Sequence, residues 1–305
     1  MKMTVSMPTS APRASRSIGA ILIDSGALSP EDAERILLLQ REQGLRFGEA
    51  AIQLGMLSES DIQYALSRQF SYAYLRTAGG DKPLSDELVA AYHPFSPRVE
   101  QIRAIRSQLM LRWFDKAEQR QVLAVIGAER GEGRSYLAAN LAVVFSQLGE
   151  RTLLIDANLR SPRQHELFLL QNKVGLSTVL AGRSREEAII RISDLAGLYV
   201  LPAGPISPNP LELLSRLNFD EFLIHARETF DVVIFDTPAL ESGEDGAMIA
   251  MRAGAAIAVA RSGITHAHAF NDMLQGLMDA GVAMVGSVMN EVPVTKQGGK
   301  KGAAR

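Results

Sequence analysis

The sequence contains no cysteine, and this absence excludes whole classes of chemistry. Disulfide bonds, cysteine nucleophiles and thiolate metal sites all need a residue that is not there. Long apolar runs are also missing. The longest, Ala253–Ala260, has about eight residues between two arginines, whereas a membrane-spanning helix needs roughly 18. Because the start shows no secretory signal pattern either, we expect a cytoplasmic protein.

The sequence also lacks an excess of positive or negative residues. Lys and Arg total 32 against 34 for Asp and Glu, which gives a formal net charge of -2. A surface that binds nucleic acid over most of its area is usually strongly basic, so we expect no nucleic-acid partner. The chain has 305 residues, of which 47% are hydrophobic and 22% charged. This is an ordinary globular composition, and its length suits one large domain and a small one.

The two ends of the chain have biased compositions. Residues 1–15 are rich in Ser, Pro, Thr and Met and predict a disordered leader. Residues 296–305 combine Lys and Arg with Gly and Ala and predict a basic disordered tail. Solvation alone explains the charge of this tail, and contact with an acidic membrane surface or partner is the alternative.

Residues 16–75 contain an internal repeat with a shift of 29 residues. Gly26 and Gly55 occupy equivalent positions, where the left-handed end of a helix favours glycine. Ser29 and Ser58 follow as equivalent N-caps. Each copy therefore predicts a helix, a glycine stop and a second, capped helix. Two such copies can bury one face against each other, which predicts a small helical repeat domain.

A linker is predicted over residues 76–93, and beyond it short apolar runs alternate with helical segments. Such alternation is typical of a mostly parallel sheet with helices on both faces, so we predict an α/β domain over residues 94–295. The predicted strands are Val122–Ile126, Thr152–Ile155, Leu198–Leu201, Val232–Phe235, Ala256–Ala260 and Met284–Met289.

A glycine-rich segment follows the first predicted strand and opens a predicted helix, as a phosphate-binding loop requires. Its glycines let backbone N–H groups turn around a phosphate, and the helix N-terminus adds positive potential. Ser135 offers a hydroxyl to Mg²⁺, and Arg134 replaces the usual lysine with a fork of donors. A glycine-rich turn without a ligand is the alternative. The predicted nucleotide contacts are Arg130, Gly131, Glu132, Gly133, Arg134, Ser135 and Tyr136.

Two of the predicted strands end in aspartate, at Asp156 and Asp236. Because ligands of an open parallel sheet bind beyond the carboxyl ends of its strands, both carboxylates are expected to face the phosphate loop. A carboxylate in that place can hold Mg²⁺ or accept a proton from an attacking hydroxyl group. Each aspartate alone could merely cap the next segment, but two beside a phosphate loop favour a nucleotide site.

The segment from about Pro94 to Val292 resembles the bacterial tyrosine kinases of exopolysaccharide synthesis, and most closely the chain-length-determinant kinases of the EpsG type. The resemblance implies a P-loop NTPase fold, ATP and Mg²⁺ as cofactors, and an ATP-dependent protein tyrosine kinase that regulates polysaccharide chain length or export. The matching motifs are Gly131–Ser135 as Walker A, Leu154–Arg160 as Walker A′, Val233–Pro238 as Walker B, and further stretches at Gly175–Ser177, Ser207–Leu214 and Val288–Asn290.

The resemblance also implies roles for single residues. Asp156 would accept the proton of the tyrosine, and Arg134 would stabilise charge on the β- and γ-phosphates. Asp236 would position Mg²⁺ through water and Ser135 would bind it directly, so that the metal set is Ser135, Asp156 and Asp236. Arg134, Asp156 and Asp236 form the catalytic set, and Asn290 would meet the adenine.

Partners follow from the same resemblance. The kinase would work with a separate membrane chain-length-determinant protein, a polysaccharide co-polymerase, at the inner face of the cell membrane. Glu100, Arg103 and Arg106 match the motif through which such kinases form rings, although this spacing is also common on a solvated helix face. The repeats in residues 16–75 resemble the N-terminal domains of type II secretion and pilus ATPases. They predict a protein-docking module, with binding of cyclic di-GMP as the alternative.

Two departures from the family pattern keep other functions open. Asn158 stands where a second aspartate is usual, and the C-terminal tyrosine cluster is absent because the last tyrosine is Tyr199. An ATP-dependent assembly switch of the partition and division-site type, without kinase activity, is therefore one alternative, and an inactive scaffold is another. A substrate tyrosine would lie on another protein or among Tyr64, Tyr72, Tyr74 and Tyr92.

Overall fold

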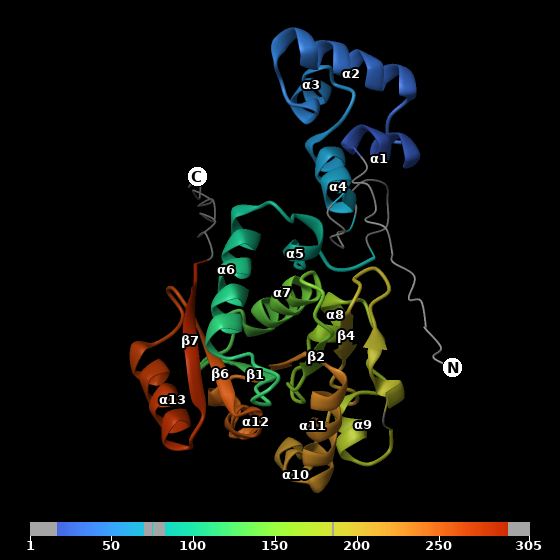
Figure 1. Cartoon of the computed structure of the whole chain (residues 1–305). Helices are drawn as coiled ribbons and strands as arrows, with labels where there is room; N and C mark the ends of the chain where they lie inside the picture. Colours follow the sequence, from blue (N-terminus) through green and yellow to red (C-terminus); the bar gives the residue numbers. More distant parts are fainter. Residues whose placement is uncertain (1–16, 70–74, 76–82, 185, 292–305) are drawn as a thin grey trace, which may run out of the picture. The chain divides into compact units, whose positions relative to one another are not determined.

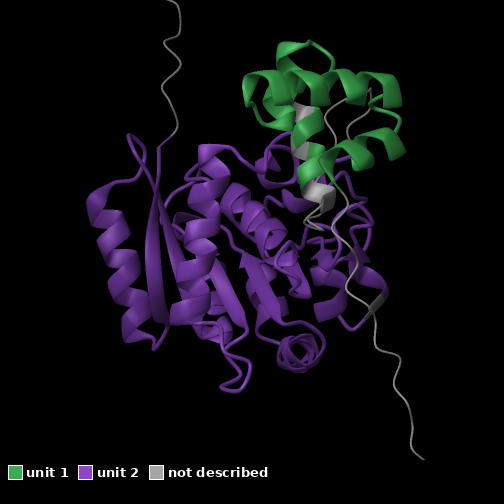
Figure 2. Cartoon of the chain, turned by 45° about the horizontal axis from the view of Figure 1, so that its top comes forward, with its two compact units in different colours: residues 1–79 green, residues 80–305 purple. Residues whose placement is uncertain are grey.

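The structure is a computed structural model, and its chain divides into two compact units, Met1–Gly79 and Gly80–Arg305 (Figure 2). The predicted leader and the predicted basic tail lie outside the described residues. Within the described part of the chain, no helix is long and apolar enough to span a membrane. The structure describes residues 17–69, 75, 83–184 and 186–291.

The described residues of unit 1 form four helices that follow the predicted repeat (Figure 1). The first helices of the two copies, α1 and α3, are separated by the 29 residues of the repeat. Contacts cross between the copies, because α1 packs on α4 and α2 packs on α3. Neither copy therefore buries its apolar side without the other. The helices are α1 (Ile18–Asp24), α2 (Pro30–Gln43), α3 (Phe47–Gln53) and α4 (Glu59–Gln69).

The helix ends of unit 1 agree with the sequence patterns. Gly26 and Gly55 have φ values of 70° and 67°, in the left-handed region where glycine is favoured. The Ser29 hydroxyl caps α2 by accepting the N–H of Asp32 at 3.1 Å. These features depend on residues close in sequence, so the chain alone predicts them. The buried core consists of Leu22, Leu28, Ala33, Ile36, Ala50, Ala51, Leu57 and Ala65.

Unit 2 contains a seven-stranded sheet in the order β3-β4-β2-β5-β1-β6-β7. All neighbouring strands pair in parallel except β3, a two-residue edge strand that runs antiparallel to β4. The sequence did not predict β3, because two residues carry no pattern. The strands are β1 (Val122–Ile126), β2 (Thr152–Asp156), β3 (Ile190–Arg191), β4 (Leu198–Leu201), β5 (Val232–Asp236), β6 (Ala255–Arg261) and β7 (Ala283–Asn290).

Helices cover both faces of the sheet (Figure 1), and β1, β2 and β5 are buried at every residue. One face carries α7 with α5, α6 and α8 packed around it, and the other carries α12 with α10, α11 and α13. This is the predicted α/β architecture. The helices are α5 (Val89–Tyr92), α6 (Pro97–Arg112), α7 (Arg134–Ser146), α8 (Gln164–Leu167), α9 (Leu176–Leu180), α10 (Pro210–Leu214), α11 (Leu217–Thr229), α12 (Asp245–Ala253) and α13 (Ala267–Asp279).

Residues 83–93, predicted as the end of a linker, lie in the α/β unit instead. The short helix α5 packs on α7, and Leu88 is fully buried. Asn140 of α7 holds this segment, because its Oδ1 accepts the N–H of Ala90 at 3.0 Å and its Nδ2 donates to the Glu87 carbonyl at 2.9 Å. Such bonds join residues far apart in sequence and leave no local pattern.

Replacing Asn140 tests this anchor. Asn140→Leu keeps a similar volume but leaves the buried N–H of Ala90 without a partner, so we expect a loss of about 2 kcal/mol in the free energy of unfolding. Urea denaturation measures the loss. Gln275→Leu is the control, because the Gln275 amide bonds to exposed Asp279 on α13. A loss no larger than that of the control would contradict the anchoring role.

Candidate active site

The segment between β1 and α7 has the conformation of a phosphate-binding loop. Gly131 and Gly133 have φ values of 79° and 97°, and Gly133 is the N-cap of α7. The N–H groups of the first turn of a helix have no intrahelical acceptor, so they are available to an anion. Gly127 was not predicted but is needed, because a Cβ on it would lie 2.1 Å from Oε2 of Glu132.

Arg134, the first residue of α7, is held inside this loop and is only 8% exposed. Its guanidinium donates to the Glu129 carbonyl at 2.5 Å, to Glu132 Oε2 at 2.9 Å and to the Thr237 carbonyl at 3.3 Å. Glu132 is fully buried, and its other oxygen accepts the Thr265 hydroxyl at 2.6 Å. Burial lowers the pKa of Arg134 and raises that of Glu132. The loop thus contains a braced positive charge.

Asp156 and Asp236 lie side by side at the carboxyl edge of the sheet. The parallel strands β2 and β5 pair them in register, and both are fully buried. Burial raises the pKa of Asp156 to about 8, and the neighbouring charge of Asp236 acts in the same direction. Burial also raises the pKa of Asp236. Two buried acids this close hold a proton between them until positive charge favours the ionised forms.

Hydrogen bonds orient both carboxylates. Asp156 Oδ2 accepts the backbone N–H groups of Arg163 and Gln164, each at 2.8 Å. Asp236 Oδ2 accepts Nε2 of Gln164 at 2.8 Å, and the Ser135 side chain also bonds to Asp236. The structure therefore brings the predicted metal set of Ser135, Asp156 and Asp236 together. It adds Gln164, which the sequence did not predict.

The oxygen atoms of this cluster suit Mg²⁺. Asp236 Oδ1 is buried and has no hydrogen-bond partner among the described residues. Mg²⁺ is bound through one or two carboxylates together with water and phosphate oxygens, rather than by a cage of protein ligands. The described part of the chain contains no group of three or more His, Asp or Glu side chains that could hold a metal ion by themselves. The residues present fit a Mg²⁺–nucleotide complex.

Three further predicted residues lie around the loop. Asn290, at the end of β7, donates to the Glu132 carbonyl at 2.9 Å, and its contact with adenine stays a prediction. The side chain of Arg130 is 73% exposed, while its backbone N–H donates to Glu241 Oε1 at 2.9 Å. Tyr136 lies in the first turn of α7 with its hydroxyl group buried. The structure thus places all three near the loop.

Asn158, the replacement for a second aspartate, shapes a turn. Its Oδ1 accepts the N–H of Ser161 at 3.0 Å, and its Nδ2 donates to the Ser161 carbonyl at 2.7 Å. Local bonding of this kind is typical of asparagine. Two residues on, Arg160 donates to buried Asp245 of α12 at 2.5 Å. The segment after β2 is therefore tied to α12.

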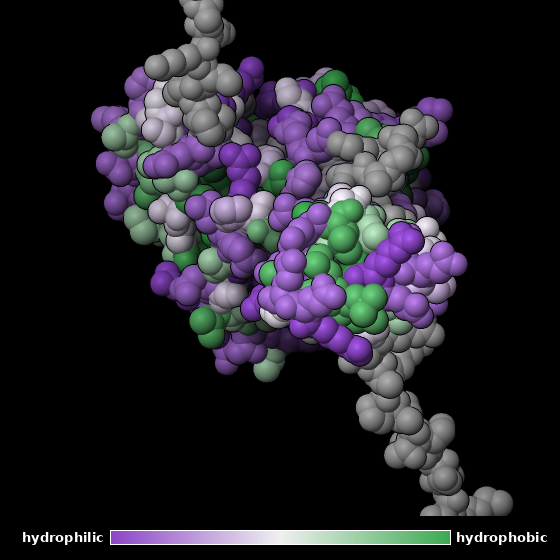
Figure 3. Space-filling view, turned by 90° about the horizontal axis from the view of Figure 1, so that it is seen from above, coloured by the Kyte–Doolittle hydropathy of each residue, from purple (hydrophilic) through white to green (hydrophobic). Residues whose placement is uncertain are grey.

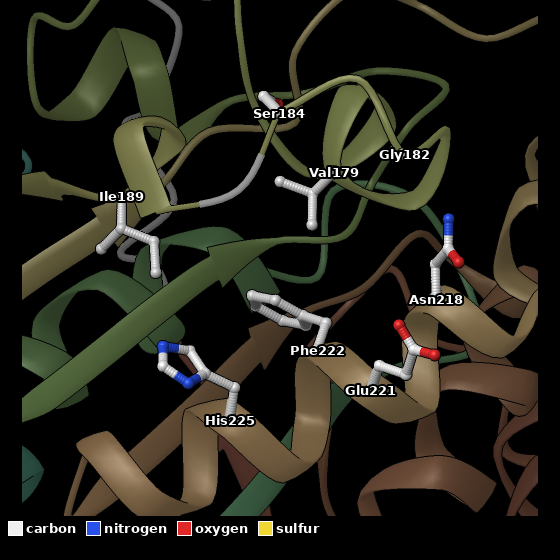
Figure 4. A pocket seen from close by; sticks show the side chains of 8 residues that line it. All are labelled: Val179, Gly182, Ser184, Ile189, Asn218, Glu221, Phe222 and His225. Atoms are coloured by element: carbon white, nitrogen blue, oxygen red, sulfur yellow. The ribbon is translucent and has the colours of Figure 1, made fainter.

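A separate cavity of about 280 Å³ lies between α9 and α11 (Figure 4). Val179, Ile189 and Phe222 form its apolar part, and Glu221 and His225 project from α11. None of the predicted site residues lines it. This cavity is therefore not part of the nucleotide site.

The buried acid pair predicts how stability depends on pH. Folding raises the pKa of an acid when it favours the protonated form, so the folded state weakens as pH rises. With a pKa of about 8 for Asp156, the free energy of unfolding of the nucleotide-free protein should fall between about pH 5 and pH 8. One proton limits the slope to ~1.4 kcal/mol per pH unit.

Asp156→Asn should remove most of this slope, which urea denaturation across the pH range measures. The two proteins differ at this residue alone, so contributions common to both cancel in the comparison. Equal slopes in the two proteins would show that the pair does not share a proton.

Comparison with known proteins identifies the family. No protein-family model matches the chain. It is 37% identical over 209 residues to the tyrosine-protein kinase YwqD of Bacillus subtilis, with 68% of this chain and 87% of that protein covered. It is 33% identical over 204 residues to the tyrosine-protein kinase etk of Escherichia coli K12, where 67% of this chain covers 28% of that protein.

The comparison with solved structures agrees. The kinase domain of Escherichia coli tyrosine kinase ETK superimposes with a TM-score of 0.65 at 31% identity, covering 72% of this chain and 84% of that one. The mostly parallel sheet, the phosphate loop and the two strand-end aspartates occur here in a single unit. The chain belongs to the bacterial tyrosine-protein kinase family.

Proposed function

We propose that this chain transfers the γ-phosphoryl group of ATP to the hydroxyl group of a tyrosine, and that it thereby regulates exopolysaccharide chain length or export. The observation that carries the proposal is the in-register pairing of Asp156 and Asp236 beside the phosphate loop. The names of the relatives state tyrosine kinase activity for those proteins.

In the proposed reaction, the tyrosine oxygen bonds to the γ-phosphorus while the bond to the bridging oxygen of ADP breaks. Asp156 accepts the hydroxyl proton, and Arg134 stabilises charge on the phosphates. Ser135 and Asp236 would hold Mg²⁺, which supplies positive charge against the phosphate oxygens. Positive charge beside Asp156 also favours its ionised, proton-accepting form. Phosphoryl transfer needs little beyond such positioning and electrostatic stabilisation.

The structure narrows the choice of substrate tyrosine. Tyr92 is 4% exposed, and its hydroxyl donates to the Leu84 carbonyl at 2.8 Å and accepts the Leu84 N–H at 3.0 Å. It is therefore not accessible for phosphorylation. Tyr72 and Tyr74 lie outside the described residues, and Tyr64 is half-buried in α4. We propose that the main substrate is a tyrosine of another protein.

Asp156→Asn tests the kinase mechanism. Loss of the base should lower phosphotyrosine formation by about 10²- to 10⁴-fold, while the affinity for ADP changes by no more than a few-fold because the phosphate loop is unaltered. Labelled ATP with Mg²⁺ and the membrane partner, followed by mass spectrometry, measures the product. Asp272→Asn, at an exposed carboxylate of α13, is the matched control.

The same assay separates the alternatives. Release of phosphate without phosphotyrosine from the unmodified protein would refute the kinase proposal in favour of an assembly switch. Binding of ATP without any turnover would favour an inactive scaffold.

We also propose ring assembly through α6. Glu100 is exposed and forms an ion pair with half-buried Arg103 on this helix. Arg106 Nη1 donates to the Val144 carbonyl of α7 at 2.9 Å, so it also joins two helices of the same unit. Glu100 and Arg103 are therefore the residues of the motif that we assign to contact with a neighbouring copy.

Glu100→Ala should abolish the ring, because it removes an exposed charge that we assign to the contact with a neighbouring copy, while leaving the folded chain within about 0.5 kcal/mol of its original stability. Light scattering on the protein with Mg²⁺ and ADP measures the mass. If the variant forms an assembly of the same mass as the unmodified protein, Glu100 does not hold the interface.

Unit 1 is proposed as the docking module for the membrane chain-length-determinant partner, which would recruit the kinase to the inner face of the membrane. Four large apolar side chains of its described residues are exposed: Leu37 by 42% and Leu38 by 58% on α2, Ile52 by 46% on α3, and Leu54 by 39% at the end of α3. Figure 3 shows apolar side chains gathered among hydrophilic ones. Such patches are typical of protein interaction sites, and binding of cyclic di-GMP remains the alternative.

A further inference from the structure

Gln164, the first residue of α8, connects several groups of the site. Its side chain is fully buried. Its Nε2 donates to Asp236 Oδ2 at 2.8 Å and to the carbonyl of Ser135 at 3.1 Å, while its backbone N–H donates to Asp156 Oδ2 at 2.8 Å. One residue thus joins the ends of β2 and β5 to the start of α7.

The orientation of the Gln164 amide follows from its neighbours. Both atoms that face Nε2 are acceptors, so the NH₂ group and not the carbonyl must occupy that place. The two N–H donors are then both used, one on each acceptor. Gln164 Oε1 is buried and has no hydrogen-bond partner among the described residues. The amide is therefore held by its donors, in a single orientation.

This contact determines which oxygen of Asp236 is available. Oδ2 is bonded to Gln164, and Oδ1 is buried without a partner in the described part of the chain. A donor on one carboxylate oxygen limits rotation about the Cβ–Cγ bond and leaves the other oxygen free for a cation. Outer contacts of this kind orient metal-binding carboxylates.

We propose that Gln164 is a positioning residue for Mg²⁺, which turns Oδ1 of Asp236 toward the cation and keeps it there. The inference rests on the proposed function, because it assumes a Mg²⁺–nucleotide complex at Ser135 and Asp236. Of the two carboxylates, the Gln164 side chain contacts that of Asp236, whereas the Asp156 carboxylate is bonded to the Gln164 backbone N–H. A substitution at position 164 therefore removes the bond to Asp236 and keeps the backbone bond to Asp156.

Two variants remove the bond from the side chain of residue 164 to Asp236. Gln164→Met is close in size and has no N–H, and Gln164→Asn keeps the amide but is one methylene shorter. In both, we expect the Mg²⁺ concentration that half-saturates binding of a fluorescent ADP to rise about tenfold. The affinity for the same ADP in EDTA should stay within about twofold, because the residues of the phosphate loop are unchanged and the substitution removes a single bond to the loop, at the Ser135 carbonyl. A merely structural role would change both quantities together.

Gln147→Met is the matched control. Gln147 lies at the other end of α7, where its Nε2 donates to the Ala90 carbonyl at 2.9 Å. This variant loses a similar amide bond far from the carboxylates, so its Mg²⁺ requirement should equal that of the unmodified protein. If Gln164→Met does not fold, Gln164→Asn decides the outcome.

The inference is overturned if the Mg²⁺ requirement of the folded Gln164 variants stays within twofold of the unmodified protein, or if their affinity for ADP in EDTA falls equally. Those results would leave the proposed function intact. If the affinity of the unmodified protein for ADP does not depend on Mg²⁺, the Mg²⁺–nucleotide site is refuted, and the inference is refuted with it.

Discussion

The site depends on the register between β2 and β5, which places Asp156 directly beside Asp236. Neighbouring strands lie about 4.8 Å apart, and both side chains are fully buried, so two negative charges at this spacing are unfavourable without compensation. Donors from the start of α8 and from Ser135 surround the pair. The arrangement is therefore poised for added positive charge, which a magnesium-bound nucleotide supplies.

The burial of Arg134 imposes a second constraint. A guanidinium presents more N–H donors than an ammonium group, and each donor needs an acceptor when the side chain is buried. Glu132 and two backbone carbonyls accept them. Glu132 is in turn held by Thr265, from the segment between β6 and α13. Asn290 of β7 binds the Glu132 carbonyl. The edge of the sheet thus braces a loop whose charge must stay fixed during phosphoryl transfer.

Much of the fold follows from patterns that neighbouring residues generate. Gly26 and Ser29 end and begin helices as predicted, since capping involves atoms a few residues apart. The central strand β1 matches its predicted bounds because a strand buried on both faces reads as a continuous apolar run. The same reasoning misses β3, which is too short to show a period. It also misses the packing of residues 83–93, which rests on long-range bonds from Asn140.

The site divides in the same way. The amino-acid sequence by itself determined the phosphate loop and the two strand-end aspartates, because glycine spacing and apolar runs are local, and its set of motifs resembles that of the family. Only the tertiary structure decided that Gln164 bonds to Asp236, and that Glu132 bonds to Arg134 under a brace from Thr265. Buried polar groups form hydrogen bonds with the partners that folding brings near them. These partners are distant in sequence, so no local sequence pattern predicts the bonds.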